Sequence, residues 1–137
     1  MNAKEFLFQA IRIDKEISAL KMKLLDIELR EQNLISNYSG VSVSSRNKNA
    51  SFENQVDTKE DLKIKIENRL RLLSDKEAGI FEVINQVEDS TLRALLIHKF
   101  LNRYDWAKIR QLIKYSKRQT FRLYNEALQE VEKILNN

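Results

Sequence analysis

An all-α protein is the fold class that this sequence predicts, and three observations support it. The 137 residues contain no proline and only two glycines, Gly40 and Gly79, whereas β-sandwiches and barrels need turn residues at roughly every 8–12 positions. Charged residues make up 32% and apolar residues 42% of the chain, a balance typical of long amphipathic helices. The apolar residues also recur at spacings of three and four, which is the period of a helix.

The first helix is expected from Ala3 to about Ser36. Alternating steps of four and three from Phe6 give nine positions, of which eight are apolar, and this spacing is a heptad seam. The seam residues are Phe6, Ala10, Ile13, Ile17, Leu20, Leu24, Ile27, Glu31 and Leu34. Such a seam predicts a long helix that packs along a partner helix.

A second long helix is expected to begin near Asp57 or Thr58, after a loop over residues 37–56 that is rich in Ser and Asn. Its seam is again mostly apolar and comprises Ile66, Leu70, Leu73, Glu77, Ile80, Ile84 and Val87. Two helices of similar length that are joined by a loop most simply form an antiparallel hairpin. Residues 1–88 are therefore predicted to be a helical hairpin that serves as an oligomerisation arm.

The first helix carries more apolar residues than one partner helix can cover. Beside its seam lie Leu7, Ile11, Met22, Leu25 and Leu29. Either the C-terminal part of the chain or a second copy of the protein must cover this additional stripe. We expect a homodimer that forms through these five residues.

Three shorter helices are expected in residues 89–137. The break at residues 88–90 precedes a helix from Thr91 to Leu101, and Asp105 has the position of an N-cap for Trp106–Lys114. Ser116, with Gln119 three residues later, forms a capping-box pattern before a last helix that ends near Leu135. Because only a short turn separates the last two helices, this region is predicted to be a helix-turn-helix module.

The basic residues are concentrated in this module. The segment from Thr91 to Tyr124 contains nine Lys and Arg residues and one acid, a net charge of +8, whereas the segments on either side each carry −2. A block of positive charge at helical spacing favours a polyanionic partner. A nucleic acid is therefore the partner that the charge pattern predicts, and the helix-turn-helix pattern indicates that it is double-stranded DNA.

The last helix has a basic face at its beginning, opposite its apolar stripe. Helical spacing places Lys117, Arg118, Phe121 and Arg122 on this face, where a recognition helix contacts base edges. Arg binds guanine bidentately, and Phe can contact the methyl group of thymine. The residues expected to contact phosphates are Arg103, Lys108, Arg110, Lys114, Ser116 and Gln119.

These residues resemble region 4 of bacterial sigma factors. The resemblance is carried by Leu95-Leu96, Trp106-Ala107-Lys108-Ile109, Ile113-Lys114-Tyr115-Ser116, Thr120, Leu123 and Ala127-Leu128. The same module occurs in the ArpU and RinA type late transcription regulators of phages of Gram-positive bacteria. The start at residues 1–7 and the ending at residues 127–135 are similar to a family of small phage and prophage proteins of streptococci and their relatives.

The resemblance implies sequence-specific DNA binding in transcription regulation, in a phage or another mobile element, with a homodimer or RNA polymerase as an additional anchor. The DNA-contacting positions of the family fall on Lys117, Arg118, Phe121 and Arg122. Where the family usually has Ala at a helix crossing, this chain has Arg110, and where it usually has Gly in the turn, this chain has Lys114. The second departure implies a strained turn or a slightly different one.

Several classes of function are not expected. The chain has no cysteine and one histidine, and it lacks a phosphate-binding glycine loop and a catalytic triad, so we expect no enzyme, no metal and no cofactor. It has no long apolar run and no signal-peptide pattern, so we expect a protein of the bacterial host cytoplasm. Two alternatives remain open: a DNA-packaging protein similar to small terminase subunits, and an adaptor that binds another protein through its hairpin.

Overall fold

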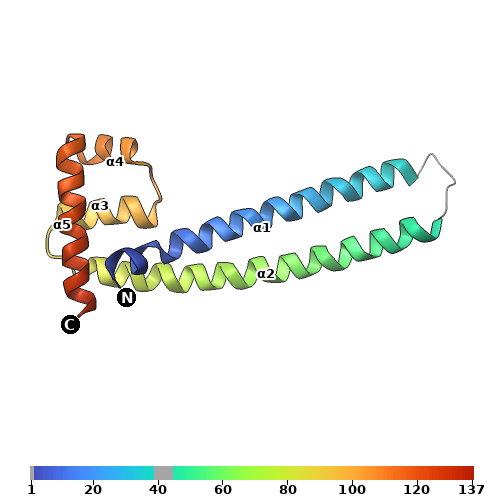
Figure 1. The fold of residues 1–137 in the computed structure, drawn as a ribbon, viewed down its shortest axis with the longest axis horizontal. Helices are drawn as coiled ribbons and strands as arrows, with labels where there is room; N and C mark the ends of the chain where they lie inside the picture. The colour runs from blue at the N-terminus through green and yellow to red at the C-terminus, as the bar shows by residue number, and fades with distance from the viewer. Residues whose placement is uncertain (1, 39–44) are drawn as a thin grey trace. The chain divides into compact units, whose positions relative to one another are not determined.

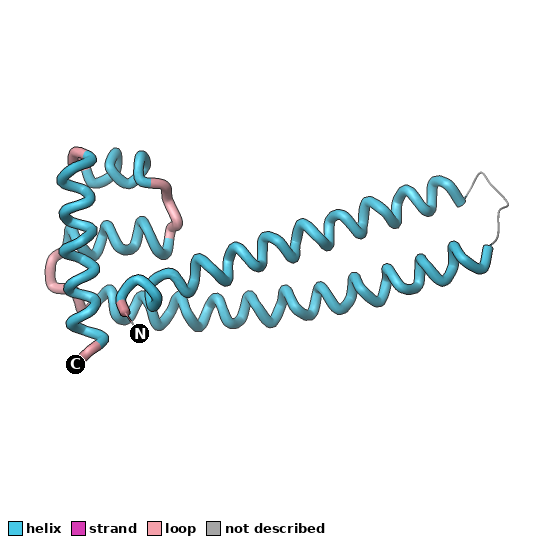
Figure 2. The backbone as a smooth tube through the Cα atoms, in the orientation of Figure 1, coloured by secondary structure: helices cyan, strands magenta, loops and turns pink. Residues whose placement is uncertain are grey.

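The computed structural model describes residues 2–38 and 45–137, and the side chains of residues 2–33 and 58–137. All regular elements in these ranges are helices, and no strand occurs there, so the predicted all-α class is confirmed (Figures 1 and 2). The elements are α1 Ala3–Tyr38, α2 Ser45–Asn85, α3 Ser90–Leu96, the π-helical turn η1 Ile97–Leu101, α4 Trp106–Ile113 and α5 Lys117–Leu135. Within the described ranges, no helix combines the length and the apolar character that crossing a membrane requires.

The chain divides into two compact units. One unit comprises Met1–Asp14 together with Leu72–Asn137, and the other comprises Lys15–Arg71. The predicted boundary after residue 88 therefore falls inside the first unit, because the first turns of α1 and the last turns of α2 pack with the C-terminal helices.

In the unit Lys15–Arg71, α1 and α2 run side by side in opposite directions (Figure 1). Glu31 forms an ion pair with Lys59 at 3.2 Å, and Glu16 forms one with Arg69 at 2.6 Å. Between these pairs, Ile17 and Ile27 of the α1 seam are buried. The predicted antiparallel hairpin is confirmed in this unit.

Two predictions about this hairpin are wrong. Helix α1 continues to Tyr38 and α2 begins at Ser45, so most of the predicted loop over residues 37–56 is helical, and residues 39–44 lie outside the described part. Residues 45–56 contain neither Gly nor Pro, and Ser and Asn each cost only about 0.7 kcal/mol or less in a helix relative to Ala. The seam residue Leu70 is 42% exposed, and its neighbour Arg69 makes the contact with α1 instead.

In the other unit, a single core joins the first turns of α1, the end of α2 and the C-terminal helices. Its fully buried residues include Leu7, Ile80, Ile84, Leu95, Leu96, Phe100, Ile109 and Val131. The ring of Phe8 in α1 meets the ring of Phe100 edge-on at 5.1 Å. The prediction that Leu7 is an oligomerisation residue is therefore wrong, because Leu7 has no exposed surface and belongs to the core of its own chain.

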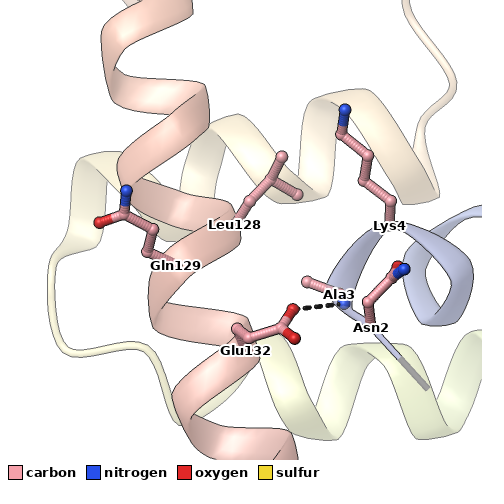
Figure 3. A pocket seen from close by; sticks show the side chains of 6 residues that line it. All are labelled: Asn2, Ala3, Lys4, Leu128, Gln129 and Glu132. Atoms are coloured by element: carbon pink, nitrogen blue, oxygen red, sulfur yellow. Dashed lines mark hydrogen bonds between the residues drawn. The ribbon is translucent and has the colours of Figure 1, made fainter.

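The first turn of α1 is also attached to α5. The backbone N–H of Ala3 donates a hydrogen bond of 2.7 Å to Oε2 of Glu132 (Figure 3). A carboxylate at this place satisfies one of the N–H groups that a helix leaves unpaired at its N-terminus. The bond lies in an open pocket lined by Asn2, Ala3, Lys4, Leu128, Gln129 and Glu132.

Candidate nucleic-acid interface

The helix-turn-helix module begins with α3 and the turn η1. The side chain of Asp89 caps α3 and accepts hydrogen bonds from the backbone N–H groups of Thr91 at 2.8 Å and Leu92 at 3.1 Å. The predicted helix from Thr91 to Leu101 is present, but its second half is the π-helical turn, which the sequence did not predict. This turn places Phe100 in the core, in contact with Phe8.

Helix α4 begins after Asp105, as predicted, and ends at Ile113, one residue earlier than expected. Oδ1 of Asp105 accepts a hydrogen bond of 2.8 Å from the backbone N–H of Lys108. After Ile113, Lys114 adopts the left-handed conformation with φ 61° and ψ 41°, which a side chain disfavours and glycine does not. The short connection to α5 (Figure 2) is thus a strained turn, one of the two outcomes that Lys114 in place of Gly implied.

Helix α5 is capped by Ser116, as predicted. Its hydroxyl oxygen accepts a hydrogen bond of 3.2 Å from the backbone N–H of Gln119. The hydroxyl of the fully buried Thr120 donates one of 2.8 Å to the carbonyl oxygen of Ser116. These two bonds fix where the helix starts, and they determine which side chains occupy its first two turns.

An aromatic cluster orients these turns relative to α4. The ring of Trp106 lies 5.0 Å from that of Phe121 and 4.9 Å from that of Tyr124. Trp106 is half-buried, and burial raises the pKa of the Tyr124 phenol above its ordinary value of 10.0. Phe121 remains 36% exposed, so its ring contacts Trp106 at a tilt of 54° and is still partly accessible beside the basic residues.

The three predicted base-contacting cations are exposed at the beginning of α5. Lys117 and Arg118 lie in its first turn, which contains no acid, and in the described part of the chain neither forms an ion pair. Arg122, one turn later, lies 3.8 Å from Glu126, with 64% of its side chain exposed. Lys117 and Arg118 therefore stand at the positive end of the helix dipole, a position that favours acids.

The side chains predicted to contact phosphates differ in whether they already make contacts within the protein. Lys114 and Gln119 are exposed. The ammonium group of Lys108 lies over the ring of Tyr104, 4.0 Å from its centre. Nε of the half-buried Arg110 donates a weak hydrogen bond of 3.4 Å to the carbonyl oxygen of Trp106, so its guanidinium lies against the backbone of its own helix.

Arg103 has a different environment from the other candidates. It adopts a positive φ of 57°, and its guanidinium forms ion pairs with Asp14 at 3.2 Å and with Glu77 at 2.9 Å. These three residues belong to the same unit, and they connect α1 and α2 to the segment before α4. Arg103 is therefore already engaged by two carboxylates, which its position in the basic segment could not indicate.

The sequence interpretation also missed Lys99, whose ammonium group lies 4.8 Å from the centre of the Trp106 ring. In the sequence, a Lys seven residues before a Trp does not indicate a contact between the two side chains. The turn after η1 brings Lys99 and Trp106 together. The module as a whole presents exposed cations, a partly exposed aromatic ring and a capped helix N-terminus on α4, the turn and α5. No family model, curated protein or solved structure matches this chain.

Proposed function

We propose that the chain binds double-stranded DNA through the first two turns of α5. The observation that carries the proposal is the exposure of Lys117 and Arg118 in a first turn that contains no acid. A cation at this end of a helix lowers the stability of the protein by about 0.3–1 kcal/mol. An anionic ligand bound at the same place removes this penalty, and DNA supplies a regular array of phosphates.

In this proposal, α5 enters the major groove as the second helix of the module. Arg118 and Arg122 bind the O6 and N7 atoms of guanine, and the partly exposed ring of Phe121 contacts a thymine methyl group. Arg122 exchanges its contact with Glu126 for DNA, a small loss because the pair is long and exposed. Lys117 reads a neighbouring base.

The phosphate contacts fix the register of α5 on the duplex. Lys114 in the turn, Ser116 at the cap of α5 and Gln119 in its first turn are exposed and lie close together in the chain. Lys108 and Arg110 contribute from α4 after leaving Tyr104 and the Trp106 carbonyl. Arg103 contributes least, because its two ion pairs would have to break first.

The biological role that fits this activity is transcription regulation in a phage or another mobile element, as the resemblance to sigma region 4 implies. Two other roles remain distinguishable by experiment. A ring of many subunits would favour DNA packaging, whereas the absence of any DNA affinity at low salt would favour a protein-binding adaptor.

The test is to select bound duplexes from a random pool and then to titrate the selected and a scrambled duplex at several salt concentrations. Arg118→Ala should weaken binding to the selected duplex by about 1–3 kcal/mol and blur the sequence preference. The matched control is Arg71→Ala, which removes the same charge from an exposed position of α2 outside the module. Equal binding by wild type and both variants would contradict the proposal.

A further inference from the structure

Helix α1 has an exposed apolar stripe in the unit Lys15–Arg71. Met22 is 65% exposed, Leu25 47% and Leu29 51%. Their spacings of three and four place them on one face, and the exposed Ser18 continues this face by one turn. Helical geometry puts this face on the side of α1 away from the buried Ile17 and Ile27.

The two edges of this stripe differ in their charges. On one edge, Asp26 pairs within the helix with Arg30 at 3.1 Å and with Lys23 at 3.8 Å. On the other edge lie Lys21 and Glu28, seven residues apart, and neither forms an ion pair in the described part of the chain. A positive and a negative side chain are therefore left unpaired at opposite ends of the same apolar segment.

We infer that a second copy of this chain packs antiparallel on the α1 stripe formed by Ser18, Met22, Leu25 and Leu29. In heptad terms these residues alternate between the two core positions, so that Met22 packs on the partner's Leu25, and Leu29 on the partner's Ser18. The same register places Lys21 beside the partner's Glu28. Because a twofold interface repeats each contact, two Lys21–Glu28 pairs form.

The charges beside the stripe favour a second copy of the chain as the partner, and they favour an antiparallel arrangement. An edge with one cation and one anion is complementary to itself only when the second copy runs the opposite way. A parallel copy would instead bring Lys21 beside the partner's Asp26, which already has two basic neighbours in its own helix. The inference does not depend on DNA binding, since it uses only residues of the unit Lys15–Arg71.

Sedimentation equilibrium of the full chain over a wide range of concentrations tests the pairing. Lys21→Glu and Glu28→Lys each replace two attractive pairs by two repulsive ones, and each should raise the dissociation constant of the dimer about tenfold. An equimolar mixture of the two variants should dimerise as wild type does, because both contacts become attractive again. A wild type that stays monomeric at the highest concentration overturns the inference, as does a mixture that fails to associate.

A matched pair of apolar positions tests the surface itself. Leu25→Glu should give a monomer, whereas Ile64→Glu, at a 55% exposed position of α2 outside the stripe, should leave the dimer intact. Since both residues are exposed, both variants should still unfold cooperatively, and the Leu25 variant should lose only the stability that dimerisation adds. Loss of association in the Ile64 variant, with the Leu25 variant still dimeric, would place the interface on α2 and overturn the inference.

Discussion

Arg103 and Arg118 belong to the same basic segment, but the structure surrounds them differently. Arg103 lies between two carboxylates, at 3.2 Å from Asp14 and 2.9 Å from Glu77, and 31% of its side chain is exposed. Arg118 is exposed in the first turn of α5, which contains no acidic residue. The segment therefore contains cations that hold the fold together and cations that are available to a ligand, and its net charge of +8 does not separate the two kinds.

The largest expected effect concerns the available cations. The double variant Arg118→Ala/Arg122→Ala should lose about 2–6 kcal/mol of binding free energy for its specific duplex, which is the sum of two base contacts. Its free energy of unfolding should not fall and should rise by at most about 1 kcal/mol, because both side chains are exposed and the loss of Arg118 removes an unfavourable charge from the N-terminus of α5. Fluorescence anisotropy and urea unfolding measure the two quantities. A double variant that binds DNA as wild type does would show that Arg118 and Arg122 do not contact DNA.

The opposite result is expected for the engaged cation. Arg103→Ala should lower the free energy of unfolding by about 1 kcal/mol, because it removes two partly exposed ion pairs, and the difference should shrink in high salt. Arg103→Gly should be less destabilised, since glycine adopts the positive φ at this position without strain. If Arg103→Ala instead unfolds like wild type and loses DNA affinity, Arg103 is a phosphate contact after all.

Lys114 is expected to affect both the stability of the protein and its binding to DNA. Lys114→Gly should raise the free energy of unfolding by about 0.5–1 kcal/mol, because it relieves the left-handed backbone of the turn. Lys114→Ala removes the same charge and keeps the strain, so it should not gain stability. Both variants should flatten the salt dependence of DNA binding by about one counterion. Thermal unfolding and titrations at several salt concentrations check this, and equal stability of the two variants would contradict the strain.

The smallest effect is expected at Glu126, the acid paired with Arg122. Glu126→Gln removes the 3.8 Å pair with Arg122 and should change the free energy of unfolding by less than about 0.5 kcal/mol. Because Arg122 no longer exchanges partners on binding, affinity for DNA should rise by about twofold at low salt. A fall in affinity would indicate that Glu126 orients Arg122 for its base.

Local features of the fold were predictable from the sequence, because their causes lie within a few residues. The caps Asp105 and Ser116 act on N–H groups three residues later, and Lys114 lies where the turn requires a positive φ. The burial of Ile17, Ile27 and Ile66 follows from heptad spacing. Each of these predictions needed only a helix and its immediate neighbours.

Features that depend on distant segments were not predictable in this way. The burial of Leu7 and the two partners of Arg103 result from packing between α1, α2 and the C-terminal helices. The helical start at Ser45 shows that a polar segment without Gly or Pro can remain helical. For the candidate site, helical spacing identified the exposed face of α5. It could not tell which Lys and Arg side chains were already held in ion pairs within the protein.

The hydrogen bond between Ala3 and Glu132 has a consequence for the order in which parts of the chain fold during synthesis. Its two residues are 129 positions apart, so at synthesis rates of about 5–20 residues per second the first turn of α1 waits about 6–26 seconds for α5. During this time Ala3, Leu7 and Ala10, all buried in the finished fold, have no C-terminal helices to cover them. The hairpin can assemble before α5 has been synthesised, whereas the core around Leu7 is completed only when the C-terminal helices are present.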